Sequence, residues 1–520
     1  MLFHQLYQRA AQQSSEDTAL IFGDLMLTYG ELHGQVERAA GGLQALGVKA
    51  GDRVAIYAAQ GLEMVISMLA VSRSSAVFVP INPSLKAVQV GHILEDSKPV
   101  ALVVDRGRLA ALNDVALPDH VVVIGADEAS VDQTWEALVD TALASPCSVG
   151  QNDLAALFYT SGSTGRPKGV MLSHKNIVEG ARSVSTYLAN KSTDRLLCAL
   201  PLSFDYGFSQ ITTALYVGAT TVLINYLFPK DILNAVERHG VTGLACVPPL
   251  WQQLVALDWP EGAMDSLRYM TNSGGQLPEA TVNSMRSRLP EAQLFLMYGL
   301  TEAFRSTFVD PGRHDLAVNA IGLPIPGATI DVVNGNGEIC EAGEEGELVH
   351  SGPLVAQGYW QDPAQSAIRF RPAPSESEQA GRPAVWSGDI VYRDAEGILY
   401  FVGREDGQIK TSGYRVSPTE IEESVLALDG VAECVAVGAP HPQLGQAIVL
   451  YVAMEPAAVL DQAFLLRHCK QQLPAFMVPR SVRFSQDLPR NANGKHDRAA
   501  LQEEVAGLFV ETGADKGKSP

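Results

Sequence analysis

The sequence is poor in positive charge, in closely spaced cysteines and in long apolar runs. Its 520 residues hold 38 lysines and arginines against 58 aspartates and glutamates, a formal net charge of −20 at pH 7. Binding along a nucleic acid needs a broad basic face, so we expect no nucleic-acid partner. A single nucleotide held at a local basic site remains compatible with this charge.

The six cysteines are scattered, and no two of them stand at Cys-x-x-Cys spacing. We expect free, buried thiols in a reducing compartment, with neither a disulfide nor a zinc site. Apolar tracts such as residues 64–71 are far shorter than the roughly 20 residues that a transmembrane helix needs. The N-terminus also lacks a basic segment followed by an apolar core. We therefore predict a cytoplasmic protein with no secretory signal and no transmembrane segment.

Short apolar runs alternate with helical patterns over the first 300 residues. Examples are residues 53–57, 100–104, 243–247 and 293–297, which are rich in Val, Ile, Leu and Ala. Continuous apolar runs separated by helices predict a parallel sheet that is covered on both faces. A capping-box spacing after Thr28 predicts the start of one of these helices.

The pattern changes twice in the second half of the chain. From about residue 320 glycines and prolines multiply and the strands shorten, which predicts a β-rich subdomain. After Gly403 the pattern restarts: Ser417-Pro-Thr-Glu420 predicts the start of a helix, and a strand, a strand, a helix and a strand follow, which predicts a small α+β domain. The expected fold class is thus α/β, with a large N-terminal domain of parallel-rich sheets at 1–403, a C-terminal domain at 404–512 and a disordered tail at 513–520.

The stretch 158–169, Phe-Tyr-Thr-Ser-Gly-Ser-Thr-Gly-Arg-Pro-Lys-Gly, follows an apolar run and combines hydroxyls, glycines and a lysine. Such a loop can turn many N–H groups and hydroxyls toward one anion, which predicts a polyphosphate site. It does not match the P-loop spacing of kinases and GTPases. A flexible linker has a similar composition, but the apolar segments on both sides favour a braced loop.

Three more stretches offer polar side chains to a ligand, and the first of them follows an apolar strand, where ligands gather in open α/β sheets. Tyr298-Gly-Leu-Thr-Glu302 offers a ring for a flat base, a hydroxyl for phosphate and a carboxylate for Mg²⁺. Trp386-Ser-Gly-Asp389 offers a carboxylate suited to a ribose diol, and a Pro/Asn/Gly loop presents Lys495. The simpler alternatives are a strand end with a helix-capping Thr, a turn aspartate and a solvated surface lysine.

Together and in this order, these stretches resemble the family of AMP-forming adenylating enzymes. That family includes acyl- and aryl-CoA synthetases, adenylation domains of nonribosomal peptide synthesis, and luciferases. The resemblance covers essentially the whole chain. The motifs that carry it are Tyr159-Thr-Ser-Gly-Ser-Thr-Gly-Arg-Pro-Lys-Gly169, Tyr298-Gly-Leu-Thr-Glu302, Trp386-Ser-Gly-Asp389, Gly403-Arg-Glu-Asp406, Lys410-Thr-Ser-Gly-Tyr-Arg415 and Asn493-Gly-Lys495.

The resemblance implies two half-reactions. A carboxylic acid and ATP form an acyl-adenylate with release of pyrophosphate, and a thiol then displaces AMP to give a thioester. The implied cofactors are ATP, Mg²⁺ and CoA, or the phosphopantetheine of an acyl or peptidyl carrier protein in place of CoA. The implied substrate is a small carboxylic or amino acid.

The resemblance also implies roles for the nucleotide site. The loop residues grip the β- and γ-phosphates; they are Thr160, Ser161, Gly162, Ser163, Thr164, Gly165 and Lys168. Tyr298 flanks the adenine, Thr301 meets the α-phosphate and Glu302 binds Mg²⁺. Lys495 bridges the carboxylate and the α-phosphate in the first half-reaction.

The remaining implied roles concern the ribose and the movement of the C-terminal domain. Asp389 and Arg404 take the ribose hydroxyls. Asp406 matches the hinge position, about which the C-terminal domain swings. After that swing, Gly413, Tyr414 and Arg415 face the site for the thiol step, so that one mobile domain presents two faces in turn.

The acid is harder to infer. Ser-Phe-Asp205 is similar to amino-acid-adenylating members, in which that aspartate pairs with the substrate ammonium; a helix N-cap near Tyr206 is the equally simple alternative. Arg305 either meets a second anion of the substrate or braces the pocket wall. The mixed pocket composition does not suit a long fatty chain. The further pocket positions implied by alignment are Ser209, Cys246, Met270, Asn272 and Met297.

Residues 202–210, 271–275 and 297–307 are also similar to acyl-CoA ligases associated with exosortase gene clusters. We therefore predict an AMP-forming acid–CoA ligase. The alternative is a free-standing amino-acid-adenylating enzyme that loads a peptidyl carrier protein. A non-catalytic nucleotide-binding module is a third interpretation, against which Lys495, Glu302 and the full loop stand, and a luciferase-like oxygenase has no support beyond the fold.

Overall fold

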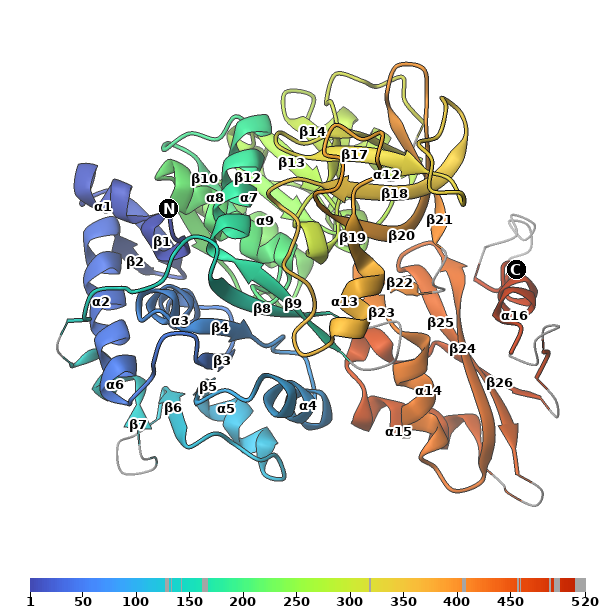
Figure 1. The fold of residues 1–520 in the computed structure, drawn as a ribbon, viewed down its shortest axis with the longest axis horizontal. Helices are drawn as coiled ribbons and strands as arrows, with labels where there is room; N and C mark the ends of the chain where they lie inside the picture. The colour runs from blue at the N-terminus through green and yellow to red at the C-terminus, as the bar shows by residue number, and fades with distance from the viewer. Residues whose placement is uncertain are drawn as a thin grey trace, which may run out of the picture.

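The computed structural model describes residues 1–126, 131, 133–141, 143–160, 167–317, 319–404, 408–455, 458, 460–485, 488–490 and 496–509, with only the backbone of residues 404 and 499. Figure 1 shows a large N-terminal part, blue to yellow, and a smaller C-terminal part, orange to red, beside it. The predicted α/β fold class, with a parallel-rich N-terminal part and a separate small C-terminal sheet, is confirmed. The boundary between residues 403 and 404 stays a prediction. No helix in the described ranges has both the length and the apolar character of a membrane span.

The smaller sheet of the N-terminal part is parallel apart from its last pair of strands, β8 and β9. Its central strands β3, β4 and β5 are apolar and buried, as expected for a sheet with both faces covered. Across the antiparallel pair, Thr160 lies opposite Lys168. In spatial order the strands are β7 (Gln133–Thr134), β6 (His120–Ile124), β5 (Ala101–Asp105), β3 (Arg53–Tyr57), β4 (Val77–Pro80), β8 (Leu154–Thr160) and β9 (Lys168–Ser173).

The larger sheet begins as a parallel array. The hairpin strand β2 (Leu25–Thr28) stands at its edge, antiparallel to β1. The parallel strands, in order, are β1 (Thr18–Phe22), β11 (Thr220–Leu223), β10 (Arg195–Cys198), β12 (Gly243–Cys246), β13 (Tyr269–Asn272) and β14 (Gln293–Tyr298).

The predicted β-rich region continues this larger sheet by antiparallel pairing and does not form a sheet of its own. The carboxyl end of β14 is therefore hydrogen-bonded to a β-rich wall. That wall runs in the order β15 (Thr307–Val309), β16 (Ala320–Pro324), β21 (Leu399–Arg404), β20 (Pro383–Arg393), β18 (Glu345–Ser351) and β17 (Thr329–Val333), with β19 (Phe370–Pro372) beside β20.

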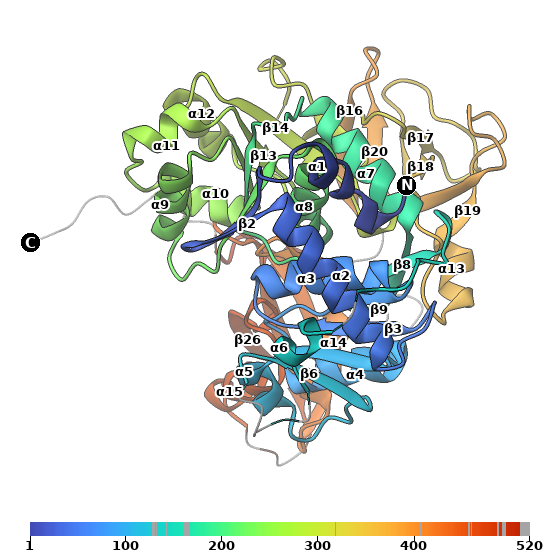
Figure 2. The same ribbon diagram turned by 90° about the vertical axis from the view of Figure 1, so that its left-hand side faces the viewer.

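Helices fill the space between the two sheets, as Figure 2 shows for α2, α3 and α8. α3 (Leu62–Arg73) contacts strands of both sheets and is buried along nearly its whole length, as its apolar sequence requires. α2 (Tyr29–Ala45) begins with the predicted capping box: the Glu31 N–H donates to Thr28 Oγ1 at 3.2 Å, and Glu31 Oε2 accepts from the Thr28 N–H at 2.8 Å. α7 (His174–Tyr187) and α8 (Asp205–Val217) complete this layer.

The C-terminal part has its own sheet and core. α14 (Pro418–Leu426) begins where Ser417 and Pro418 predicted, although Ser417 makes no side-chain capping bond. α15 (Gln462–Gln472) and α16 (Arg498–Glu504) accompany it. The strands run in the order β23 (Tyr414–Val416), β22 (Ile409–Thr411), β25 (Gly445–Met454) and β24 (Val431–His441), with β26 (Ser481–Ser485) beside β25.

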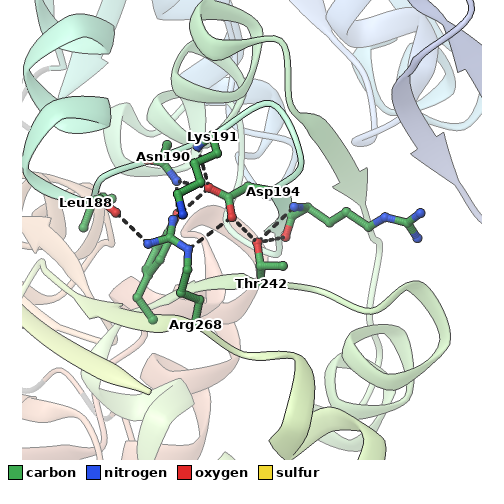
Figure 3. Close-up of polar contacts among 8 residues, drawn as sticks. Leu188, Asn190, Lys191, Asp194, Thr242 and Arg268 are labelled. Atoms are coloured by element: carbon green, nitrogen blue, oxygen red, sulfur yellow. Dashed lines mark hydrogen bonds and ion pairs between the residues drawn. The ribbon is translucent and has the colours of Figure 1, made fainter. Parts of the chain in front are cut away.

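An ion pair between a buried aspartate and a partly exposed arginine ties together the amino ends of three parallel strands (Figure 3). Asp194 precedes β10, Thr242 precedes β12 and Arg268 precedes β13. The Asp194 carboxylate accepts from Arg268 Nη2 at 2.7 Å, Arg268 Nε at 3.2 Å, Thr242 Oγ1 at 2.9 Å and the Lys191 N–H at 2.8 Å. Burial alone would raise the pKa of Asp194, but the donors, led by Arg268, hold it below its ordinary value.

Replacing Asp194 with Asn should lower the free energy of unfolding by about 2–4 kcal/mol, because Arg268 loses its buried partner. The folded pKa is depressed, so the stabilisation is complete at neutral pH. It declines as the pH falls below the ordinary carboxyl pKa and is lost below the folded one. Urea unfolding of both proteins across this pH range measures the effect.

Asp24→Asn is the matched control, because Asp24 forms an exposed ion pair with Arg238 and such pairs contribute only about 0–1 kcal/mol. Equal destabilisation by the two substitutions would contradict the clamp.

Candidate active site

A cavity of about 930 Å³ opens between the N-terminal part and the C-terminal part. Its floor is formed at the carboxyl ends of β8, β13 and β14, which is where open α/β sheets bind ligands. The C-terminal part contributes residues 413–415, Glu420 and Phe476 to its other wall. Its size falls within the range of small-molecule sites.

Of the predicted site residues that the structure describes, most line this cavity and four lie behind its wall. Ser209, Cys246, Met270 and Asp389 are buried and do not line it. The lining set is Thr160, Lys168, Asp205, Asn272, Met297, Tyr298, Thr301, Glu302, Arg305, Gly413, Tyr414 and Arg415. Outside the described residues lie Ser161, Gly162, Ser163, Thr164, Gly165, Asp406, Lys495 and the side chain of Arg404.

Three predicted residues meet around Asp389, which is fully buried on β20. The Tyr298 hydroxyl donates to Asp389 Oδ2. Arg415 Nη2, from the C-terminal part, lies 3.9 Å from the same oxygen and donates to the Gly299 carbonyl at 3.3 Å. Arg404 stands opposite Asp389 in the β20–β21 ladder. The Asp389 carboxylate thus lies between Tyr298 at the end of β14 and Arg415 of the C-terminal part.

Glu302 lies in a short 3₁₀ turn, η4 (Thr301–Ala303), at the end of β14 and is buried. Its Oε1 accepts from the Tyr359 hydroxyl at 2.8 Å. Burial, and next the Glu302 charge, raise the pKa of Tyr359. Lys168 approaches the same ring, with Nζ 5.4 Å from its centroid, and donates to Gln365 Oε1 at 3.2 Å. The predicted phosphate lysine and the predicted metal carboxylate therefore flank one tyrosine.

The C-terminal part packs against the cavity through residues 413–415. Gly413 has φ +81°, and a Cβ atom there would lie 2.8 Å from Val247. The Tyr414 ring stacks on Phe476, with centroids 3.9 Å apart, and burial raises the pKa of Tyr414. Burial also raises the pKa of Glu420 to about 7 at this junction.

Asp205 and Arg305 form a buried pair in the cavity wall. Asp205 Oδ2 lies 3.8 Å from Arg305 Nη1, and the two side chains are 5% and 3% exposed. Burial raises the pKa of Asp205, while Arg305 and then Arg415 oppose that shift. The helix N-cap is Phe204 and Asp205 is the first helical residue, so Asp205 is not the N-cap, although its Oδ1 accepts from the Tyr206 N–H at 2.8 Å in the first turn.

Sequence patterns missed several residues of the site. Tyr359 and Gln365 have no motif around them, and their contacts with Glu302 and Lys168 span 57 and 197 residues. Tyr206 lies beneath the Arg305 guanidinium at 4.5 Å, and its hydroxyl hydrogen-bonds Thr271 at 2.6 Å. In each case the partner is set by packing between distant segments.

In the described part of the chain, no three His, Cys, Asp or Glu side chains gather as a possible metal site. Glu302 is the carboxylate that could hold a hard cation together with ligand oxygens. Among the described residues, only Tyr359 donates a hydrogen bond to the Glu302 carboxylate, and none forms an ion pair with it.

Comparison with known proteins gives matches along nearly the whole chain. The family model "AMP-binding enzyme" matches residues 7–360, and "AMP-binding enzyme C-terminal domain" matches residues 420–495. The chain is 31% identical to a feruloyl-CoA synthase from Amycolatopsis, covering 94% of this chain and 96% of that protein. It is also 30% identical to bacitracin synthase 3 from Bacillus licheniformis over 96% of this chain, but spans only 8% of that protein's length.

One solved enzyme matches in two states. A double mutant of the o-succinylbenzoate-CoA synthetase from Bacillus subtilis, bound to a product analogue, has a TM-score of 0.83 at 27% identity. The same synthetase in complex with AMP has a TM-score of 0.69 at 26% identity. Both matches cover 96% of this chain and 98% of the other. The resemblance seen in the sequence motifs is confirmed: the chain belongs to the AMP-binding enzyme family.

Proposed function

We propose that this protein is an AMP-forming acid–thiol ligase. It activates a carboxylic acid with ATP, releases pyrophosphate and passes the acyl group to CoA. The observation that carries this proposal is the convergence of Lys168, Tyr298, Glu302 and Arg415 on one cavity between the two parts of the chain. Membership of the family and the match to a feruloyl-CoA synthase support it.

The chemistry explains why such a site needs cations and donors. A carboxylate is a poor electrophile, and the adenylyl group that ATP supplies turns one of its oxygens into a leaving group. Two anions must be held together, so positive charge near the α-phosphate lowers the barrier. Lys168 is suited to the outer phosphates and Thr301 to the α-phosphate.

Glu302 is suited to hold Mg²⁺. Glu302 is buried. Among the described residues, only the Tyr359 hydroxyl donates a hydrogen bond to its carboxylate, and none forms an ion pair with it. A buried carboxylate needs a cation nearby. In nucleotide sites Mg²⁺ is bound by one or two protein carboxylates, and its other ligands are phosphate oxygens and water.

The orientation of the C-terminal part favours the second half-reaction. Residues 413–415 lie against the cavity, and Arg415 reaches Gly299 and approaches Asp389. The higher TM-score to the synthetase bound to its product analogue than to its AMP complex supports the same assignment. In the other half-reaction Lys495 would occupy this wall, after rotation about Asp406.

Amino-acid adenylation with transfer to a carrier protein is the second candidate. Asp205 in the cavity wall and the match to a bacitracin synthase favour it. An ammonium is not needed to neutralise Asp205, however, because Arg305 lies beside it. The pair therefore favours an acid without an α-ammonium.

A pyrophosphate-exchange panel of fatty, aryl, oxo and amino acids tests the proposal. We expect acid-dependent exchange, followed by thioester formation with CoA. Exchange with amino acids alone, together with transfer to a holo carrier protein, would favour the second candidate. ATP binding without exchange for any acid would overturn both.

Lys495→Ala should slow adenylation by about a hundredfold or more, because the anions lose their bridging cation. Thioester formation from preformed acyl-AMP should be nearly unchanged. Single-turnover rates of the two half-reactions measure this. Lys470→Ala, an exposed lysine on α15, is the control; an equal loss in both half-reactions would remove Lys495 from the first step.

Gly413→Ala should slow thioester formation at least about tenfold, because an alanine at φ +81° is strained and its Cβ would clash with Val247. Adenylation should continue at its normal rate. Gly397→Ala is the matched control, with a similar φ of +87° but only Leu323 nearby, at 3.9 Å. Loss of adenylation as well would show that Gly413 does more than seat the domain.

A further inference from the structure

Arg305 is a buried cation in the cavity wall with hydrogen-bonding capacity to spare. It is 2% exposed and lines the cavity. Its Nη1 donates to the Phe304 carbonyl at 3.1 Å and lies 3.8 Å from Asp205 Oδ2. Nε and Nη2 have no hydrogen-bond partner among the described residues. Buried donors in folded proteins nearly always have an acceptor. The described residues supply none for these two nitrogens, so the acceptor must come from elsewhere.

The position of Arg305 is fixed by the backbone and by its neighbours. Phe304 has φ +61° and ψ −61°, and the Arg305 N–H bonds the Ala303 carbonyl at 2.7 Å, which makes a tight three-residue turn of the strained type. One face of the guanidinium lies over the Tyr206 ring at 4.5 Å. A strained residue held by its surroundings is typical of functional positions. The turn and the ring together keep the arginine beside the cavity.

The charge balance decides which acceptor suits this arginine. Asp205 already stands beside Arg305, so the pair has no net charge. A second substrate carboxylate would add a buried charge without its own counterion, which is unfavourable. An uncharged carbonyl oxygen would satisfy the donors without upsetting the pair.

The surroundings match an otherwise apolar acyl group. Pro248, Pro249, Leu277 and Met297 line the same cavity. Asn272 Oδ1, also in this wall, has no hydrogen-bond partner among the described residues. Ligand sites commonly combine apolar walls with a few placed polar groups that decide specificity.

We propose that the protein selects acids whose acyl part carries an uncharged carbonyl oxygen, and that Arg305 donates to this oxygen from Nε and Nη2. This proposal rests on the acid–thiol ligase activity proposed above. It assigns Arg305 as the residue that determines specificity for the acyl group.

Matched acids test the proposal. The panel compares straight-chain acids, oxo acids and dicarboxylic acids of equal length, such as hexanoic, 5-oxohexanoic and adipic acid, with longer and aryl counterparts. For the intact enzyme, we expect kcat/KM in pyrophosphate exchange to be at least about a hundredfold higher for the best oxo acid than for its methylene analogue.

Arg305→Lys keeps a positive charge beside Asp205 but has no N–H groups at the Nε and Nη2 positions, so it should reduce this ratio to near one while exchange persists. Arg313→Lys is the control, since the ion pairs that Arg313 forms with described residues are with exposed carboxylates, and it should keep the full ratio. A thermal melt of each variant checks that it is folded. If Arg305→Lys does not fold, Arg305→Met combined with Asp205→Asn makes the same test without a lone buried charge.

Other outcomes would overturn specific parts of the proposal. Equal use of hydrocarbon and oxo acids would show that a buried water satisfies Arg305. Preference for the dicarboxylic acids would overturn the uncharged acceptor, and unchanged selectivity in Arg305→Lys would overturn the role of Arg305. In each of these cases acid-dependent exchange remains and the ligase function stands. If none of the acids supported pyrophosphate exchange, the ligase function itself would be overturned.

Discussion

The need to balance buried negative charge shapes this site. Three carboxylates, Asp205, Glu302 and Asp389, are buried at or beside one cavity. Asp205 has Arg305 next to it, and Glu302 receives the Tyr359 hydroxyl. Asp389 receives the Tyr298 hydroxyl and has Arg415 3.9 Å away. Because Arg415 belongs to the C-terminal part, the position of that part changes the electrostatics of the site. A domain that moves would therefore change which anions the cavity holds best.

The parallel strands separate stability from chemistry. At their amino ends, Asp194 and Arg268 hold β10, β12 and β13 together through a partly buried ion pair and its hydrogen bonds. At their carboxyl ends lie the residues of the cavity. The antiparallel strands that extend the sheet from β14 carry Asp389 back to the same place. The amino ends of the strands are thus held together away from the cavity. At the carboxyl ends, a few contacts position the side chains of the cavity, and the C-terminal part supplies one of its walls.

Much of the fold and part of the site could be predicted from local patterns. Apolar runs predicted β3 and β14 within a residue, and the spacing of Thr28 and Glu31 predicted the start of α2. The same kind of pattern left two roles open at Asp205, where Phe204 takes the N-cap and Asp205 accepts only from the Tyr206 N–H of the first turn. It also missed Tyr359, because no local spacing marks a tyrosine that meets Glu302 from 57 positions further along the chain.

The sequence alone determined the family, the α/β fold class and the motifs, because periodicity and motif spacing are local properties that survive without knowledge of packing. Only the tertiary structure decided that Asp205 faces Arg305, a hundred residues away, and that Gly413 rests on Val247. Such pairs depend on which distant segments pack together. The distinction matters for the proposed function: the motifs support the proposal of activation by adenylation, whereas the buried charges and their spare donors support the proposal of which acid fits.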